Sequence, residues 1–424
     1  DIGRIFLPTA TGITAKQVCS LTFVSGLDPD RARALYVDPL LGEPATLISA
    51  RVDREDRSVH SRALGLWHNE AVYREGLGCT LVHNDGDFDR DLSVPWTREP
   101  VYFDLDTAHR DAHFNTGALE AAIETGFEDP NGLRNTLAIV ILHEGRLVAE
   151  RYAPGLSREN RLHSWSMAKS VAATLAGAMT LNGELDIYAE GGIDLLDGLG
   201  PDAEATTIDD LLRMTGGRAV HEYNDGTDPN SDMLFTETDM AAFSASRERL
   251  HPPGAHWEYM SGDTVLATRE MQSRLGDTLE DQLRTVRERV FAPVGAYSPI
   301  FEADAAGTLQ GSSYIYATPQ DWARLMQLYL DDGMVGSQRV LPEGWRDYVT
   351  TPTPGSDGDY GSGFWLAPEL TPEAFYMSGF QGQTAIAVPE HNLVIVRMGA
   401  TTLTNTGTFT MARAVTAALQ DAAD

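Results

Sequence analysis

The stretch HSWSMAKSVAATLAGAMTLNGELDI (163–187) places Ser166 and Lys169 three positions apart. Residues at this spacing lie on the same face of an α-helix, so the lysine amine can hydrogen-bond the serine hydroxyl. A desolvated lysine can release its proton and then act as a base toward that hydroxyl. The pair predicts a nucleophile with its general base. The alternative is a serine and a lysine that share a helix face by chance.

The composition of the chain favours the chemical interpretation of this pair. Of the 32 Lys and Arg residues, only Lys16 and Lys169 are lysine. Arginine stays protonated near neutral pH and cannot serve as a base, whereas lysine can. The small and apolar residues 170–181 predict a buried helix that ends at Asn182-Gly183. Ser166 and Lys169 would then lie in its first turn, where the helix dipole favours negative charge.

Two later segments carry residues that would complete a hydrolytic site. In YMS (259–261), Tyr259 precedes an apolar helix and can project from a turn into a cleft; the alternative is a half-buried tyrosine with a solvated hydroxyl. In MSGFQGQ (377–383), the glycines allow close backbone approach to a ligand, and a strand N–H there can complete an oxyanion hole. The alternative is a hairpin strand with glycine bulges. A G-x-S-x-G motif is missing, which argues against an α/β-hydrolase.

In this order, the three segments resemble the serine β-lactamase and penicillin-binding protein superfamily, for which S-x-x-K is a signature. They are most similar to the family VIII carboxylesterases and the 6-aminohexanoate-dimer (nylon-oligomer) hydrolases. YMS (259–261), GFQGQ (379–383) and the helix-like stretch ATPQDWARLMQLYLDDG (317–333) carry that similarity. The resemblance covers residues 116–424 and implies a serine hydrolase that works through an acyl-enzyme.

The resemblance also implies roles for single residues. Ser166 would be the nucleophile, Lys169 the general base and Tyr259 the relay that passes a proton to the leaving group. The backbone N–H groups of Ser166 and Phe380 would form the oxyanion hole. Tyr223 lies in the loop HEYNDGTDPNSD (221–232), where the nylon-oligomer hydrolases carry a substrate-contacting tyrosine; the alternative is a tyrosine in an Asx-turn loop. The expected substrate-binding residues are Tyr223, Ser261, Ser378 and Gly379.

Two departures from the superfamily pattern bear on the substrate. Penicillin-recognising members carry Tyr-x-Asn and a strand triplet Lys-Thr-Gly or His-Thr-Gly, whereas here Ser261 and the triplet Met377-Ser378-Gly379 stand in those places. The strand cation is therefore missing, although an arginine from elsewhere in the fold is an open alternative. We expect hydrolysis of small uncharged or cationic esters and amides, with β-lactams as poor substrates. The alternatives are a penicillin-binding or sensor-type protein with little turnover, and a D-amino-acid peptidase or β-lactamase.

The pattern of strands and helices predicts an α+β fold for residues 116–424. A hairpin at 135–153 and β-like segments at 378–389 and 393–402 predict one antiparallel sheet built from both ends of this unit. Helices flank the sheet, and the mainly helical region 185–330 forms an inserted lobe, an architecture of the β-lactamase/transpeptidase type. Residues 1–115 predict a β-rich N-terminal extension of unassigned function, with β-leaning stretches at 18–27, 45–53, 61–67 and 78–84.

Charge and composition limit the partners of the chain. The formal net charge of −30 disfavours nucleic acid and anionic membranes and is typical of a highly soluble or salt-adapted protein. Apolar runs are too short to span a bilayer. We expect neither a cofactor nor a metal, because HExxH is missing and no histidine cluster with ligand spacing accompanies the cysteines. The partner would be a small-molecule substrate, and the oligomeric state stays open.

Cys19 and Cys79 are the only cysteines of the chain. They predict either a disulfide that closes a loop of about 60 residues or two buried thiols. A disulfide would indicate a periplasmic or secreted protein, with the cytoplasm as the alternative. The first residues resemble neither a signal peptide nor a lipidation motif, and a removed signal is compatible with them.

Overall fold

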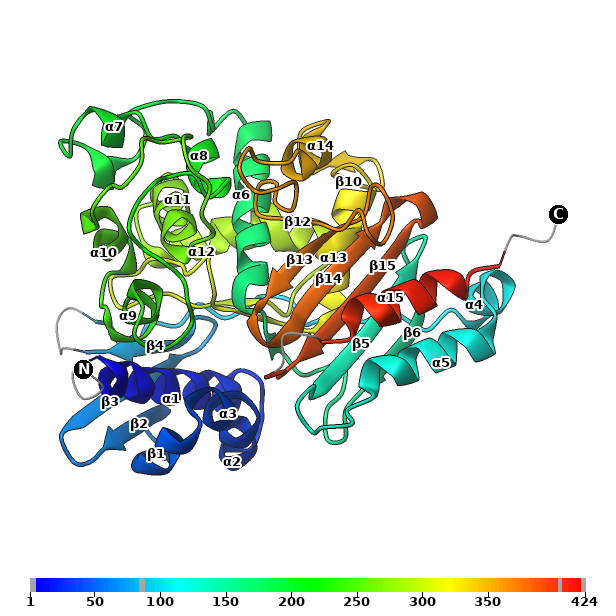
Figure 1. Cartoon of the computed structure of the whole chain (residues 1–424), viewed down its shortest axis with the longest axis horizontal. Coiled ribbons are helices and arrows are strands. Elements are labelled where there is room, and N and C mark those ends of the chain that lie inside the picture. The colour runs from blue at the N-terminus through cyan, green and yellow to red at the C-terminus, as the bar shows by residue number, and fades with distance from the viewer. Residues whose placement is uncertain (1–4, 84–87, 403–405, 421–424) are drawn as a thin grey trace.

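The computed structural model describes residues 5–83, 88–402 and 406–420, and a six-stranded antiparallel sheet lies at its centre (Figure 1). The strand order is β12-β13-β14-β15-β5-β6. The early hairpin pairs with the last strand, with Ile141 opposite Ile395. The sheet is thus built from both ends of the unit, as the sequence predicts. Its strands are β5 (Thr136–His143), β6 (Arg146–Tyr152), β12 (Trp365–Leu366), β13 (Phe375–Gly379), β14 (Gln383–Val388) and β15 (Leu393–Gly399).

Helices cover both faces of this sheet. On one face, α5 (Thr116–Phe127) and α15 (Thr408–Ala417) pack against each other and against Ile139 and Ile141. Alternate residues of the same strand, such as Val140, point to the opposite face and join the main core with α13 (Pro319–Leu330). A fully buried strand with apolar residues on both faces is the reason why β5 shows no polar alternation in its sequence.

In the sequence, the inserted helical lobe lies between β7 and β9. These two strands pair with each other in a separate small sheet with the order β7-β9-β8. Short polar residues start its helices: Asp228, Asp239 and Thr278 each accept a backbone N–H of the first turn, and Thr207 forms a capping box with Asp210. The lobe and its flanks comprise β7 (Leu162–His163), α6 (Ala168–Leu181), α7 (Pro201–Glu204), α8 (Ile208–Leu212), α9 (Pro229–Thr236), α10 (Met240–Ser246), α11 (Ser261–Ser273), α12 (Leu279–Val286), β8 (Ile300–Phe301) and β9 (Ile315–Ala317).

The segment 378–389, expected as one strand, is divided. β13 ends at Gly379, a tight turn follows over Phe380–Gly382, and β14 begins at Gln383. Gln381 has a φ of 60°, a left-handed conformation that a continuous strand cannot contain. The remaining elements are α4 (Thr107–His113), β10 (Met334–Val335), β11 (Gln338–Arg339) and α14 (Trp345–Thr350).

The N-terminal unit, residues 5–83, begins with a helix rather than a strand. α1 (Phe6–Phe23) includes most of the 18–27 stretch, so the β-leaning prediction there is wrong. Val18 and Thr22 have the β-branched side chains typical of strands, but both are buried in α1, where packing overrides this intrinsic preference. The unit continues with α2 (Pro29–Ala32), a π-turn (Arg33–Val37), α3 (Asp38–Leu41) and a meander of β1 (Ile48–Asp53), β2 (Ser58–Ala63), β3 (Trp67–Arg74) and β4 (Gly78–Val82).

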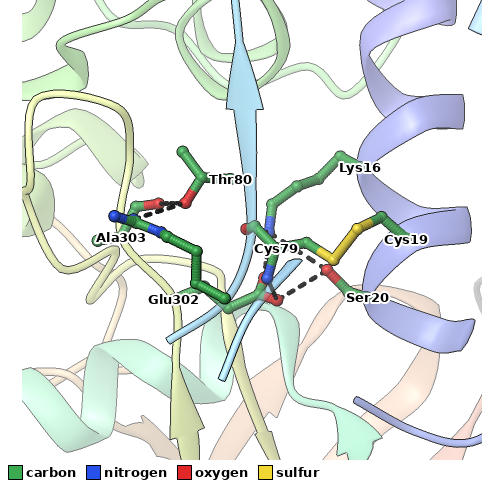
Figure 2. Close-up of a disulfide and its surroundings, with 8 residues drawn as sticks. Lys16, Cys19, Ser20, Cys79, Thr80, Glu302 and Ala303 are labelled. Carbon is green, nitrogen blue, oxygen red and sulfur yellow. Dashed lines mark hydrogen bonds and ion pairs between the residues drawn. A yellow bond between two sulfur atoms is a disulfide. The ribbon is translucent and has the colours of Figure 1, made fainter. Parts of the chain in front are cut away.

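The N-terminal unit shares its core with the rest of the chain. One cluster of buried side chains contains Val18 and Leu21 of α1 together with Leu234 of the lobe. Cys19 and Cys79 form a disulfide that joins α1 to β4 (Figure 2). A domain boundary near residue 115 therefore stays a prediction. Within the described residues, no helix combines the length and apolarity needed to cross a membrane.

Candidate active site

Ser166 lies in a single 3-10 turn (Trp165–Met167) between β7 and the first residue of α6. The residue before it, Trp165, has a φ of 47°, a left-handed conformation that is rare for a bulky side chain. Its indole Nε1 donates to Gln381 Oε1 at 3.0 Å, and its ring packs on His163. These contacts hold the turn so that Ser166 stays partly exposed between two buried neighbours.

Lys169 is one turn further on, in α6, and is 2% exposed. Its Nζ donates to Ser166 Oγ at 3.0 Å, to Ser261 Oγ at 2.9 Å and to Ser312 O at 3.2 Å. Burial disfavours the charged amine and lowers the pKa of Lys169 to about 8, while the negative charge of Glu222 acts in the opposite direction. The structure thus brings together the predicted serine and lysine, with the lysine able to lose its proton near neutral pH.

Ser261 connects Lys169 to an acidic residue that the sequence analysis did not single out. Ser261 is the first residue of α11 and is 1% exposed. Its hydroxyl accepts from Lys169 and donates to Glu222 Oε2 at 2.8 Å. Ser261 is therefore buried next to the expected base, Lys169, and contacts that base directly. Nothing in a sequence separates such a loop glutamate from the other acidic residues of a chain this acidic.

Tyr223, the expected substrate contact beside Glu222, lies elsewhere. It is 68% exposed, stacks on His221 with the ring centroids 5.9 Å apart, and is not among the residues that line the cavity at Ser166. Its neighbours Glu222 and Asn224 do line that cavity. A substrate contact by Tyr223 stays a prediction that this conformation does not support.

Tyr259 packs beside the lysine, with its ring centroid 4.8 Å from Lys169 Nζ. Tyr360 and Trp365 contact its ring at centroid distances of 5.8 and 5.3 Å and hold it in place. Burial, followed by the charge of Glu222, raises the pKa of Tyr259 well above its ordinary value, although a hydrogen bond with Ser166 opposes the shift. Tyr259 therefore carries its proton at neutral pH and is not the resting base, and its expected role as a proton relay stays a prediction.

The end of β13 approaches the nucleophile turn closely. A Cβ added to Gly379 would lie 2.1 Å from the carbonyl oxygen of Ser164, so glycine is required for this approach. Phe380 follows at once, 38% exposed, with its ring edge-on to Trp165 at 5.5 Å. Ser166 and Phe380 line the same cavity. Both residues thus border the place where a substrate would meet Ser166, and the oxyanion role of their N–H groups stays a prediction.

The cavity at Ser166 has a volume of about 80 Å³. Residues from the helical lobe, from the turn after β13 and from the N-terminal unit line it, and none of the described lining residues is Lys or Arg. Glu222 and Asp225 give it negative charge. Met377, at the place of the missing strand cation, is fully buried in the core.

Ser378 lines a different and larger groove of about 750 Å³, with Tyr376 and Phe409. It alternates with Met377 along β13 and so faces the opposite side of the sheet. Gly379 and Phe380 border this groove too. A contact between Ser378 and a substrate atom next to the scissile bond is thus not supported by the structure, whereas Gly379 lies beside the nucleophile turn.

The structure contains one histidine cluster that the sequence analysis did not expect. His109 and His113 lie one turn apart on α4 and meet His143 at the end of β5, with possible ligand atoms all within 4.8 Å of one another. His109 Nε2 and His143 Nδ1 are hydrogen-bonded at 2.9 Å, which satisfies this pair without an ion. The cluster lies at the end of β5 opposite to the nucleophile, so it takes no part in the chemistry at Ser166.

Comparison with known proteins agrees with this geometry. The family model described as Beta-lactamase matches residues 121–420. No curated protein sequence matches the chain. Among solved structures, one from Bacillus anthracis assigned as a 6-aminohexanoate-dimer hydrolase has a TM-score of 0.59 at 19% identity, covering 76% of this chain and 87% of the other.

Two further structures share the fold. One from Bacteroides dorei assigned as a β-lactamase has a TM-score of 0.58 at 17% identity, covering 72% of this chain and 99% of the other. A family VIII carboxylesterase has a TM-score of 0.54 at 17% identity, covering 76% and 99%. With the family match extending over most of the chain and a β-lactamase-type fold around Ser166, this chain belongs to the β-lactamase family of serine hydrolases.

Proposed function

We propose that this protein hydrolyses ester or amide bonds of small uncharged or cationic substrates through an acyl-enzyme on Ser166. One observation carries the proposal: Lys169 Nζ lies 3.0 Å from Ser166 Oγ, and burial lowers the pKa of that amine to about 8. A base with a pKa close to the working pH is efficient because it is partly deprotonated and still accepts a proton.

The geometry supports the following sequence of steps. The neutral Lys169 amine takes the proton of Ser166 while Oγ forms a bond to the substrate carbonyl carbon. The N–H groups of Ser166 and Phe380 stabilise the resulting oxyanion. Tyr259 gives its proton to the leaving oxygen or nitrogen as the scissile bond breaks, and it regains a proton from Lys169. Water then attacks the acyl-enzyme by the same route in reverse and frees the acid.

The charges around Ser166 support uncharged or cationic substrates. Glu222 and Asp225 line the cavity, and the buried Met377 replaces the strand cation. A substrate carboxylate would lose a charge-assisted hydrogen bond, worth about 1.5–3 kcal/mol against about 1 kcal/mol for a neutral one. The fold neighbours described as a 6-aminohexanoate-dimer hydrolase and a family VIII carboxylesterase agree with an amide or ester substrate.

A covalent probe and two variants test the nucleophile and the base. A fluorophosphonate should add one phosphonyl group to Ser166, located by peptide mass spectrometry, and Ser166→Ala should abolish the turnover of activated esters. Lys169→Arg keeps the positive charge and removes the base, so we expect a loss of about 10³-fold or more in kcat/KM. An adduct on another residue contradicts the nucleophile, and near-normal turnover by Lys169→Arg contradicts the base.

The substrate class is tested with two chromogenic compounds on the same enzyme preparation. We expect kcat/KM for p-nitrophenyl butyrate to exceed that for the anionic β-lactam nitrocefin by about tenfold, because the difference of about 0.5–2 kcal/mol between the two kinds of hydrogen bond corresponds to about 2- to 30-fold. Nitrocefin turnover equal to that of the ester would refute the assignment. It would require a cation at the site that the described lining residues do not supply.

The disulfide supports a further proposal, that the protein works in an oxidising compartment, in the periplasm or outside the cell. Titration of the unreduced, denatured protein with a thiol reagent should then find no free thiol. Two thiols per chain in protein isolated from its native host would contradict this localisation.

A further inference from the structure

We propose that the N-terminal unit completes the active site by forming the far wall of an acyl-binding subsite, which admits short uncharged acyl groups. The inference rests on the proposed function, because the acyl group is the one that Ser166 would carry. It assigns a role to residues 5–83, which lie outside the family match at 121–420.

The wall consists of side chains from two helices of the N-terminal unit. Ala10 and Ile13 of α1 and Leu40 of α3 line the same 80 Å³ cavity as Ser166 and Phe380. Ala10 and Ile13 are 1% and 7% exposed. The part of the cavity contributed by the N-terminal unit is thus mainly apolar, while the acidic lining residues come from the loop of the catalytic unit.

α1 packs closely against the catalytic unit. A Cβ added to Gly12 would lie 2.1 Å from the carbonyl oxygen of Phe235, so α1 packs directly on the backbone of α9 and requires glycine at this position. Ala10 and Ile13, which lie on either side of Gly12 in the sequence of α1, line the cavity. A helix packed this closely cannot move outward without losing the contact, so α1 holds its side of the cavity in place.

A buried polar cluster fastens the other half of α1 (Figure 2). Lys16 Nζ forms an ion pair with Glu302, which lies beyond β8 in the catalytic unit, and donates to the carbonyl oxygen of Cys79 at 2.7 Å. Ser20 Oγ and the Cys79 N–H both donate to Glu302 Oε1, at 2.8 and 2.7 Å. The disulfide between Cys19 and Cys79 closes the cluster. Three groups of the N-terminal unit, the Lys16 ammonium, the Ser20 hydroxyl and the Cys79 N–H, thus converge on one carboxylate of the catalytic unit.

A second link runs to the nucleophile turn itself. Gln381 Nε2 donates to the carbonyl oxygen of Tyr36, in the π-turn before α3, at 3.3 Å. The same amide accepts from Trp165 Nε1, next to Ser166. The N-terminal unit therefore contacts Gln381, which follows Phe380 in the chain and is hydrogen-bonded to the neighbour of Ser166.

The volume of the cavity sets the size of the acyl group. At about 80 Å³, it is roughly half of the 150 Å³ cavity that accommodates a benzene ring, which leaves room for about three or four carbon atoms. Each methylene that the cavity buries should raise kcat/KM by about fourfold, the factor that corresponds to about 0.8 kcal/mol, and a methylene beyond the cavity forgoes this gain. In the wild type, kcat/KM should therefore rise from acetyl to butanoyl esters and should not rise further with longer chains.

Chain-length profiles of wall variants test this inference. kcat/KM is measured for p-nitrophenyl acetate, butyrate, hexanoate and octanoate. Leu40→Ala and Ile13→Ala enlarge the cavity and should raise the octanoate-to-butyrate ratio by about tenfold, whereas Ala10→Leu should lower the butyrate-to-acetate ratio by a similar factor. Leu21→Ala is the matched control: it truncates a fully buried side chain of the same helix that does not line the cavity, and its profile should equal the wild-type profile.

The outcomes separate this inference from the proposed function. If the wild type forms the Ser166 adduct and hydrolyses esters, but Leu40→Ala and Ala10→Leu keep the wild-type profile, the inference is wrong and the proposed function stands. If the wild type neither reacts with fluorophosphonate at Ser166 nor hydrolyses esters, the proposed function fails first. Leu40 is only half-buried, so its truncation preserves folding even where Ile13→Ala unfolds the protein, and thermal unfolding of each variant confirms this.

Discussion

Replacing Glu222 with glutamine should make the enzyme more active at pH 7. Lys169 must be neutral to accept the proton of Ser166, and its pKa is about 8. At pH 7 only about a tenth of the molecules then carry a neutral amine, so kcat/KM rises with pH and levels off above pH 8. Glu222 raises the pKa of Lys169, because its negative charge favours the ammonium form. Removal of that charge must move the acid limb to lower pH.

The structure gives the size of this effect. Hydrogen bonds of 2.9 and 2.8 Å through Ser261 Oγ place the ammonium and carboxylate groups about 5 Å apart, where their attraction is about 1–3 kcal/mol for effective dielectric constants between 80 and 20. Since 1.36 kcal/mol corresponds to one pH unit, the acid limb should move down by about one unit or more. The neutral fraction at pH 7 then rises from about a tenth to about a half, an increase of about fivefold in kcat/KM.

The assay is the pH profile of kcat/KM for p-nitrophenyl butyrate, corrected for buffer hydrolysis and read at the isosbestic wavelength of nitrophenol. Asp225→Asn is the matched control, because Asp225 lines the same cavity while the pKa of Lys169 responds to burial and to Glu222. Its acid limb should stay at the wild-type pH. A limb that does not move in Glu222→Gln, or that moves upward, would refute the electrostatic link between Glu222 and Lys169.

Three further predictions concern the framework of the site. Replacing both Cys19 and Cys79 with serine should lower the free energy of unfolding by about 4 kcal/mol, since the bridge closes a loop with a sequence separation of 60, and urea unfolding measures it. Lys16→Met leaves the carboxylate of Glu302 buried without its ion-pair partner and should lower the free energy of unfolding by about 3–5 kcal/mol. The double variant Lys16→Met/Glu302→Gln, which removes both charges, should regain a substantial part of this loss. Gly379→Ala should push β13 away from the nucleophile turn, lower kcat by about 10²-fold and cost about 1–3 kcal/mol of stability, because the added Cβ overlaps the Ser164 carbonyl oxygen.

The parts of the site that could be predicted from the sequence are those whose residues lie close together along the chain. Ser166 and Lys169 belong to one helical turn and its approach, so their contact follows from helix geometry alone. The close approach of β13 to the nucleophile turn could be predicted at Gly379, because such an approach requires a glycine and the sequence contains one there. The sheet built from both ends followed from apolar runs that flank a helical region.

The parts that could not be predicted depend on long-range packing. Glu222 reaches Lys169 only through Ser261, which is 39 positions further along the chain. The exposed position of Tyr223 depends on how one loop residue turns against its neighbours. The strand predicted at 18–27 is wrong because β-branched residues such as Val18 and Thr22 favour a strand only weakly, and long-range packing places them in a buried helix.

The two lysines of the chain show how far composition can guide an assignment. Arginine cannot replace Lys169 as a base, because it stays protonated near neutral pH. Arginine cannot replace Lys16 either, but for a geometric reason. The Lys16 ammonium donates to Glu302, to the Cys79 carbonyl and, at 3.4 Å, to Ser20, and these three acceptors converge on one point. A planar guanidinium spreads its donors over a fork and cannot meet such a set. Both lysines are 2% exposed, one beside the nucleophile and the other at the joint that holds the N-terminal wall of the cavity. In an arginine-rich chain, a retained lysine thus marks a buried site that needs a compact cation or a releasable proton, and the neighbouring residues decide which.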